Sequence, residues 1–116
     1  MNEDFVSFSL AKKLKEKGYT LDTAHHYDDN GGIVVSLVEF DERCVYPCPE
    51  IHQVLKWLRE EKKRFVVIHP EGHDVHYYYT VHNLARSFDV FEYTQSFATY
   101  EEAALEGIEY CLDNLI

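Results

Sequence analysis

Three histidines in the second half of the chain bracket one expected turn, and their types and spacing are the best suited to chemistry. His69 precedes the turn, His73 lies within it and His76 follows it, with the carboxylates of Glu71 and Asp74 beside them. A hairpin can bring two or three imidazoles together, and imidazole is the usual transition-metal ligand in proteins. The spacing matches no helical HExxH motif, and exposed turn histidines without a metal are the commoner case. We therefore expect neither a metal nor another cofactor.

Two cysteines, Cys44 and Cys48, are separated by three residues and can supply two thiolate ligands of a zinc site. No second pair stands at a suitable spacing, and Cys111 leaves an odd number of cysteines. Reduced thiols with a structural role are therefore the expectation. A phosphate-binding loop is also disfavoured, because Asn30-Gly31-Gly32 lacks the lysine and the following helix that such loops need. No catalytic residue is predicted.

Aromatic and histidine side chains of the segment Val75–His82 favour a contact surface. Strand alternation places His76, Tyr78, Thr80 and His82 on one face of this segment. Such a face can also serve as a base-stacking platform, but those platforms come with basic surroundings. Tryptophan and arginine are residue types that anchor interfaces. The candidate contact residues are Trp57, Arg59, His76, Tyr78 and His82.

The charge of the chain is acidic and unevenly distributed. The formal net charge is −10, and residues 65–116 contain nine acidic residues against a single basic residue, Arg86. An acidic surface repels phosphate backbones and anionic lipids, which argues against nucleic-acid and membrane partners. The first residues show neither a basic leader nor an apolar segment, so we expect a cytoplasmic protein.

The stretch from residue 47 to residue 64 carries the clearest helical pattern and separates two segments that favour β-hairpins. Four apolar residues at i, i+3, i+4 and i+7 form one helical stripe: Ile51, Val54, Leu55 and Leu58. This pattern predicts a helix over residues 48–63, with Trp57 beside the stripe.

Two further helices are expected near the ends of the chain. In the segment Ser7–Lys17 the serine can cap the first turn, and Gly18 follows as the residue that ends the helix. In the segment Thr99–Leu115 the threonine opens a capping box. Gly107 interrupts the apolar stripe of this helix, which favours a close approach of another part of the backbone.

Strands are expected between these helices. The segment Asp22–Phe40 is predicted to form a hairpin around Asn30-Gly31-Gly32, because asparagine and glycine tolerate the positive φ of tight turns. Arg64–His69 and Val75–His82 are predicted to form a second hairpin, followed by a strand within Phe88–Ser96.

These elements predict one α+β domain over residues 1–116. Antiparallel strands with short turns, covered by helices on one face, give a two-layer arrangement. The expected architecture is an antiparallel sheet of four to five strands with three helices, in the order α-ββ-α-ββ(β)-α.

Three segments of the chain carry a resemblance to known proteins: VLKWLREEKK at Val54–Lys63, the opening NEDFVSFSLAKKLKEKGY and the ending TYEEAALEGIEYCLDNLI. They resemble a family of small uncharacterised proteins that recur in gut Bacteroidetes genomes and in their phages and mobile elements. The resemblance implies a small intracellular protein encoded by a mobile element. It brings no established activity and no catalytic residues.

Together these observations favour a non-enzymatic protein-interaction module that self-associates, as in a homodimer. The basic run Lys62-Lys63-Arg64 can meet the acidic C-terminal helix of a neighbouring copy. One alternative is an acidic protein that imitates the charge of DNA and binds a host nucleic-acid-handling protein. Another is a small metal-dependent enzyme that uses His69, His73 and His76.

Overall fold

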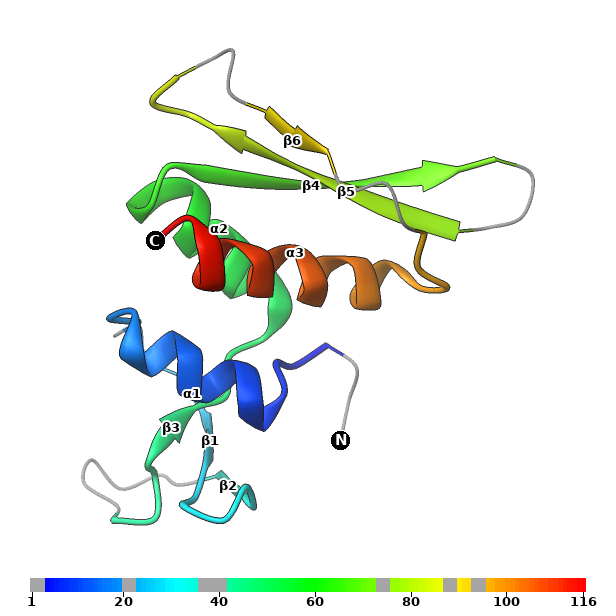
Figure 1. Ribbon diagram of the computed structural model, residues 1–116. Coiled ribbons are helices and arrows are strands. Elements are labelled where there is room, and N and C mark those ends of the chain that lie inside the picture. The colour runs from blue at the N-terminus through cyan, green and yellow to red at the C-terminus, as the bar shows by residue number, and fades with distance from the viewer. Residues whose placement is uncertain (1–3, 20–22, 36–41, 73–75, 87–89, 93–95) are drawn as a thin grey trace. The chain divides into compact units, whose positions relative to one another are not determined.

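The structure is a computed structural model of the chain (Figure 1). It describes residues 4–19, 23–35, 42–72, 76–86, 90–92 and 96–116. His73 and parts of the strands predicted at 22–40 and 88–96 lie outside the described residues. The chain divides into two compact units, Met1–Glu50 (unit 1) and Ile51–Ile116 (unit 2), each with a sheet of its own.

Unit 1 combines one helix with a three-stranded antiparallel sheet in the order β2-β1-β3. Its elements are α1 (Phe8–Glu16), β1 (His25–Tyr27), β2 (Ile33–Val35) and β3 (Tyr46–Pro47). The turn between β1 and β2 is held by the Asp28 carboxylate, which accepts bonds from the amides of Asn30 and Gly32 at 2.9 and 2.7 Å. Gly31 has a φ of 89°. These contacts confirm the predicted hairpin, because its turn requires a residue that tolerates positive φ.

Helix α1 begins and ends where its sequence signals indicate. The Ser7 hydroxyl accepts a bond from the Leu10 amide at 3.2 Å, and Gly18 follows the helix with a φ of 86°. In the same unit the Tyr27 hydroxyl donates to the Val6 carbonyl at 2.5 Å. Both residues are buried, so this bond satisfies two polar groups that water does not reach.

Unit 2 combines two helices with a three-stranded antiparallel sheet in the order β4-β5-β6. Its elements are α2 (Ile51–Glu61), β4 (Arg64–Glu71), β5 (His76–Asn83), β6 (Val90–Glu92) and α3 (Tyr100–Asn114). The β4–β5 ladder is continuous from the pair Arg64 and Asn83 to the pair Glu71 and His76. Helix α3 begins at the predicted cap, where the Thr99 hydroxyl accepts a bond from the Glu102 amide at 3.1 Å.

Gly107 lets helix α3 lie directly against the sheet of unit 2. A Cβ atom at this position would stand 2.7 Å from Cγ1 of Val66 and 3.3 Å from the ring of Tyr79. Val66 and Tyr79 are both buried on the helix-facing side of the sheet. A close approach does occur at Gly107, but the neighbours are side chains of β4 and β5 and not another part of the backbone.

The predicted α+β class with three helices is confirmed, but the single sheet of four to five strands is not. The described strands form two sheets, because each predicted hairpin is completed by a third strand within its own unit. In unit 1 this third strand, β3, was not predicted, since two residues are too few to show alternation. The order of elements is thus α-βββ-α-βββ-α.

The central helix is shorter than the predicted 48–63 and ends before Lys63, whose φ is 57°. A left-handed residue at this place stops a helix. None of the helices described is both long and apolar enough to cross a membrane.

Candidate interaction surface

The sheet of unit 2 has one face packed on helices and one face that the described elements of this unit leave uncovered (Figure 1). Val66, Tyr79 and Val81 point to the helices and are buried. Because side chains alternate along a strand, their neighbours in the ladder lie on the other face. By register this open face carries ten positions: Phe65, Val67, His69 and Glu71 of β4, His76, Tyr78, Thr80 and His82 of β5, and Val90 and Glu92 of β6.

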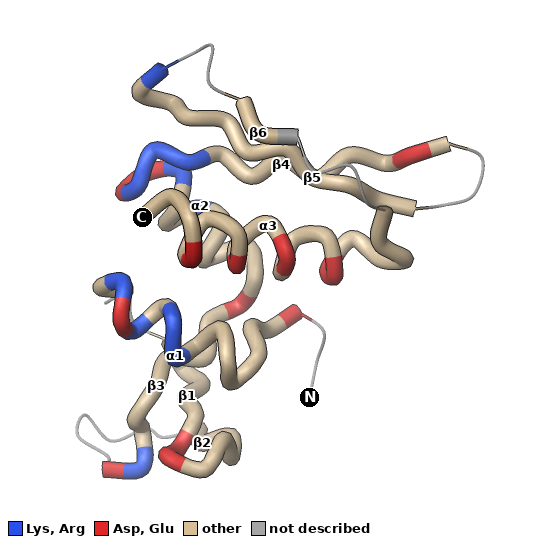
Figure 2. The backbone as a smooth tube through the Cα atoms, viewed as in Figure 1, with Lys and Arg blue, Asp and Glu red and all other residues tan. Residues whose placement is uncertain are grey.

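The open face presents large apolar side chains to solvent. Phe65 and Val90 are 38% and 47% exposed. They flank His82 in a row across all three strands, because His82 pairs with Phe65 on one side and with Val90 on the other. On β4 and β5 the face carries no Lys, Arg, Asp or Glu between Phe65 and His69 or between Tyr78 and His82. Figure 2 shows this lack of charge along the central parts of both strands.

Thr80 joins two histidines of this face in one hydrogen-bonded network. Its Oγ1 lies 2.9 Å from Nε2 of His69 and 3.1 Å from Nε2 of His82. A hydroxyl carries one proton, so Thr80 can donate to only one of the two rings, and at least one ring must donate to Thr80. A ring that donates to Thr80 carries a proton on Nε2, whereas a ring that accepts from Thr80 does so with an unprotonated Nε2. Thr80 is the central residue of the face and is 8% exposed.

Aromatic contacts stiffen the remainder of the face. The rings of His69 and Tyr78 stack at a centroid distance of 4.7 Å, and the rings of Phe65 and His82 meet edge to face at 6.4 Å. The Arg59 guanidinium of α2 lies 5.5 Å from the centre of the Phe65 ring. Each such contact limits the rotamers of the rings, so the surface is ordered before a partner binds.

The structure brings some of the predicted contact residues together and separates others. Tyr78 and His82 lie on the open face and Arg59 lies beside it. His76 is exposed at the start of β5 on this same face, opposite Glu71. Trp57 is 5% exposed, with the Lys62 ammonium 5.4 Å from its ring.

Metal-binding arrangements do not occur among the described residues. No group of three or more His, Cys, Asp or Glu side chains in this part of the chain is arranged to hold an ion. Of the predicted histidines, His69 stands opposite Tyr78 and His76 opposite Glu71, while His73 lies outside the described residues. His69 instead bonds to Thr80, a partner that spacing in the sequence did not indicate.

The thiols include two that are buried. Burial raises the pKa of the Cys48 thiol, an effect that the nearby Tyr27 hydroxyl opposes. Burial also raises the pKa of Cys111 to about 12, with Arg64 acting in the opposite direction. Both groups are held as neutral thiols at physiological pH, whereas a nucleophilic cysteine requires a lowered pKa. Cys44 is half-buried, and none of the three forms a disulfide.

The basic run Lys62-Lys63-Arg64 forms the turn between α2 and β4. The Lys63 ammonium donates to the Glu60 carbonyl at 2.9 Å, and the Arg64 guanidinium donates to Asn83 Oδ1 at 3.1 Å. These bonds hold the Lys63 side chain against the end of α2 and the Arg64 side chain against β5. They hold Arg64, the first residue of β4, in place next to Phe65.

The open face also contains residues that were not predicted as contact residues, among them Phe65, Val90 and Thr80. Alternation did place Thr80 on the same face as Tyr78 and His82, so a signal for it was present. For Phe65 and Val90 no such signal exists, because an apolar residue in a strand is more often buried. We compared the chain with protein-family models, curated proteins and solved structures, and none of the three comparisons found a match.

Replacing Thr80 by valine is expected to uncouple the two histidines while keeping the shape of the side chain. We expect the free energy of unfolding to fall by about 1 kcal/mol, because two imidazole nitrogens lose their partner. The ¹⁵N chemical shifts of His69 and His82 report the tautomers directly. Thr80→Ser, which retains the hydroxyl, is the control, and unchanged ¹⁵N shifts in Thr80→Val would contradict the network.

Proposed function

We propose that this protein is a non-enzymatic interaction module that self-associates through the open face of unit 2. The observation that carries the proposal is the exposed row Phe65–His82–Val90 on a sheet whose other face is already packed. Solvated sheet faces normally carry polar residues, and exposed apolar groups gathered on one face are typical of contact sites. The partner proposed is a second copy of the chain.

The chemistry of the face favours a like-with-like contact. In a symmetric dimer the same patch meets itself, so its groups must be self-complementary. Charged side chains near the axis would meet their own sign, whereas Tyr, Thr and neutral His can each both donate and accept hydrogen bonds. The central part of β4 and β5 consists of these residues and apolar ones. In a chain of net charge −10 this central part carries no formal charge, while Glu71 and Glu92 lie at the edges of the same face.

The size of the face predicts a weak dimer. Eight-residue strands span about 26 Å, and three strands span about 14 Å, so the flat area is at most about 370 Å² per copy, since β6 is shorter than β4 and β5. Stable interfaces usually bury about 800 Å² per partner, so this contact belongs with the small, transient ones. We therefore expect dissociation constants of micromolar magnitude or weaker.

Sedimentation equilibrium from about 1 µM to about 1 mM tests the proposal. Phe65→Asp is expected to weaken dimerisation at least about tenfold, because it would bury a carboxylate against an apolar neighbour. Val35→Asp is the matched control, since Val35 is 59% exposed but belongs to unit 1. A wild-type monomer over the whole range, or equal effects of the two variants, would refute this mode of association.

The dependence on salt separates this contact from the association of Lys62-Lys63-Arg64 with acidic α3. Two copies of an acidic chain repel, so salt should strengthen an uncharged contact by screening that repulsion. It should weaken an association made by opposite charges. The same sedimentation experiment at low and high salt therefore tells the two modes apart.

A second candidate function is an acidic binder of a basic host protein that handles nucleic acid. Its support is helix α3, which carries five acidic residues and no basic one: Glu101, Glu102, Glu106, Glu109 and Asp113. Figure 2 shows these acidic positions along the helix. A cytoplasmic location and membership of the mobile-element family that the chain resembles would fit both functions, and we retain them as proposals. The metal-dependent enzyme has no comparable support among the described residues.

A further inference from the structure

We infer that two copies join the outer edges of their β4 strands, so that the two sheets of unit 2 continue into one antiparallel sheet. This inference goes beyond the proposed contact through the open face, because it uses the edge of the sheet and leaves both open faces on the same side. It starts from the order β4-β5-β6, in which β4 pairs with β5 on one side. None of the described strands pairs with its other side.

The hydrogen-bonding groups on this outer edge follow from the β4–β5 ladder. In an antiparallel pair of strands, opposite residues alternate between those that exchange backbone hydrogen bonds and those that do not. The Leu84 amide donates to the Lys63 carbonyl at 2.8 Å, so this pair is bonded and the following pair, Arg64 and Asn83, is not. The same alternation directs the backbone groups of every second residue of β4 away from β5: Arg64, Val66, Ile68 and Pro70.

The other end of the ladder gives the same alternation. Tyr77 exchanges both of its backbone bonds with Phe97, at 2.9 and 2.7 Å, so its amide and carbonyl point away from β4. Its opposite residue in β4 is Pro70, which has no amide hydrogen to donate. The outer edge of β4 therefore presents the amides and carbonyls of Val66 and Ile68 at its centre.

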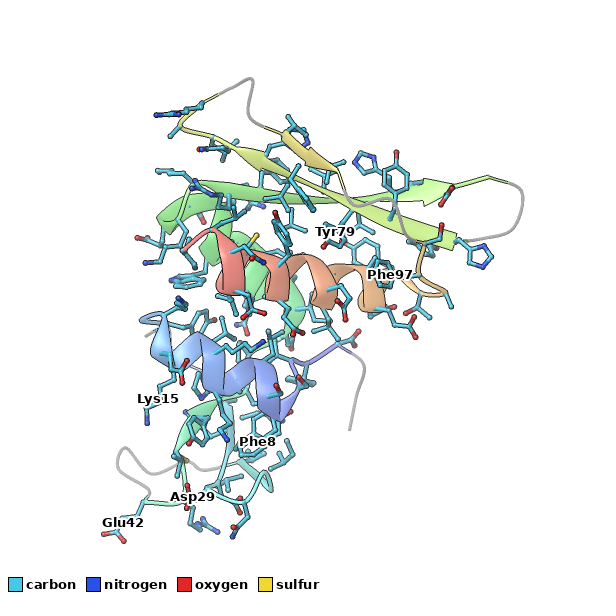
Figure 3. All side chains as sticks on the ribbon, in the orientation of Figure 1. Phe8, Lys15, Asp29, Glu42, Tyr79 and Phe97 are labelled. Carbon is cyan, nitrogen blue, oxygen red and sulfur yellow. The ribbon has the colours of Figure 1, made fainter. Side chains whose placement is uncertain are left out.

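No charged side chain protects the centre of this edge. Natural edge strands commonly carry charged residues that keep other strands away, but the residues from Phe65 to His69 include none. Figure 3 shows Tyr79 on the side of the sheet that faces α3, and Ile68, which pairs with Tyr79, points to the same side. A strand that adds to this edge therefore continues both faces of the sheet.

Charge complementarity favours β4 of a second copy as the added strand. Two β4 strands that pair antiparallel are related by a two-fold axis perpendicular to the sheet. When this axis passes beside Val67, the outward backbone groups of Val66 meet those of Ile68 of the partner subunit. The same register places Lys63 opposite the partner's Glu71 at both ends of the contact.

Registers with the axis one residue to either side do not give these charged pairs. In one of them Lys63 faces His69 of the partner subunit, and in the other Glu71 faces the partner's Phe65. Opposite charges that face each other across paired strands stabilise the pairing. The register centred on Val67 is therefore favoured.

Both charged groups have bonding capacity left for this contact. Lys63 and Glu71 are exposed, and neither forms an ion pair with another described residue. The Lys63 ammonium donates to the Glu60 carbonyl at 2.9 Å, and the Glu71 carboxylate accepts a bond from the Ser96 hydroxyl. An ammonium has three donors and a carboxylate has two oxygens, so each can also bind an opposite charge.

Amide hydrogen exchange followed by NMR tests the edge directly. The amides of Val66 and Ile68 are expected to exchange at least about threefold more slowly at about 1 mM than at about 20 µM protein, because they gain acceptors only in the paired state. The amides of Val67 and His69 are internal controls, since they are bonded to β5 in both states. Their exchange should not depend on concentration through this contact.

An exchange of charges tests the register. Lys63→Glu and Glu71→Lys are each expected to weaken the pairing at least about threefold, because each places like charges opposite each other at both ends. The double variant Lys63→Glu/Glu71→Lys restores opposite charges and should return to within about twofold of wild type at low salt. The matched control is Lys56→Glu/Glu71→Lys, which has the same net charge but alters a residue of α2. It should stay as weak as Glu71→Lys alone.

The outcomes separate this inference from the proposed contact through the open face. Sedimentation equilibrium measures the dissociation constants, and circular dichroism checks that each variant is folded. If the exchange of the Val66 and Ile68 amides does not slow with concentration, edge pairing is overturned, whatever Phe65→Asp does to self-association. An edge that another protein covers would give this result in the purified chain. Slowed exchange with equal constants for the two double variants overturns the register centred on Val67.

Discussion

Replacing Gly107 by alanine is expected to lower the free energy of unfolding by up to about 2 kcal/mol, although alanine is the better helix former. The gain in helix propensity is about 1 kcal/mol. Against it stands the added Cβ, which would lie 2.7 Å from Val66 Cγ1. Val66 is β-branched, buried and held in a strand, so it cannot rotate away easily, and overpacking of this kind costs about 1–3 kcal/mol. Gly107→Val should cost about 3 kcal/mol or more.

The background variant Val66→Ala provides the control for this prediction, because it removes the methyl group that the new Cβ meets. In that background Gly107→Ala is expected to be neutral or to stabilise by up to about 1 kcal/mol. Urea unfolding followed by circular dichroism gives the four free energies of the cycle. If Gly107→Ala has the same effect in both backgrounds, α3 does not approach β4 as closely as the structure shows.

A loss of stability at alkaline pH is the second large effect, and Cys111 is its cause. Burial raises the pKa of this thiol to about 12, whereas the pKa of a cysteine in an unfolded chain is about 8.5. The folded state therefore holds a proton that the unfolded state releases first. The stabilisation is complete below about pH 8.5 and is lost progressively as pH rises toward about 12. The slope reaches about 1.4 kcal/mol for each pH unit.

Cys111→Ala isolates this contribution from other groups that titrate in the same range. Burial also raises the pKa values of Tyr27 and Cys48 in unit 1, and these shifts remain in the variant. Between about pH 9 and about pH 10.5, wild type should lose about 2 kcal/mol more than Cys111→Ala. Urea unfolding under reducing conditions measures both. If the free energies of unfolding of wild type and Cys111→Ala change with pH in parallel, the fold does not hold the thiol neutral.

Local signals in the sequence were sufficient for the ends of several elements. Ser7 and Thr99 each cap a helix with a hydroxyl three residues before the amide that it accepts from. The Asn30-Gly31-Gly32 turn is held by Asp28, which lies two residues before it in the chain. All of these interactions join residues at most four positions apart. Their physical cause is therefore contained in a short stretch of sequence.

The candidate surface was only partly predictable. Alternation places Tyr78, Thr80 and His82 on one face without any knowledge of the fold, because the period of a strand is two. It does not say whether that face is covered. The exposure of Phe65 depends on both helices packing on the other side of the sheet, and Trp57 is buried although its place beside the helical stripe predicted a contact residue.

The sequence by itself determined the presence of the three helices, the N-caps of α1 and α3, the turn of the first hairpin and which residues share a face of β5. The tertiary structure alone decided that each hairpin gains its own third strand and that His69 and His82 meet at Thr80. The reason is register, since His69 lies eleven residues from Thr80 and on another strand. A shift of one residue in the β4–β5 pairing would turn His69 away from this face. The register also decides which face is buried, and in the observed register Val66 and Tyr79 lie against Gly107 of α3.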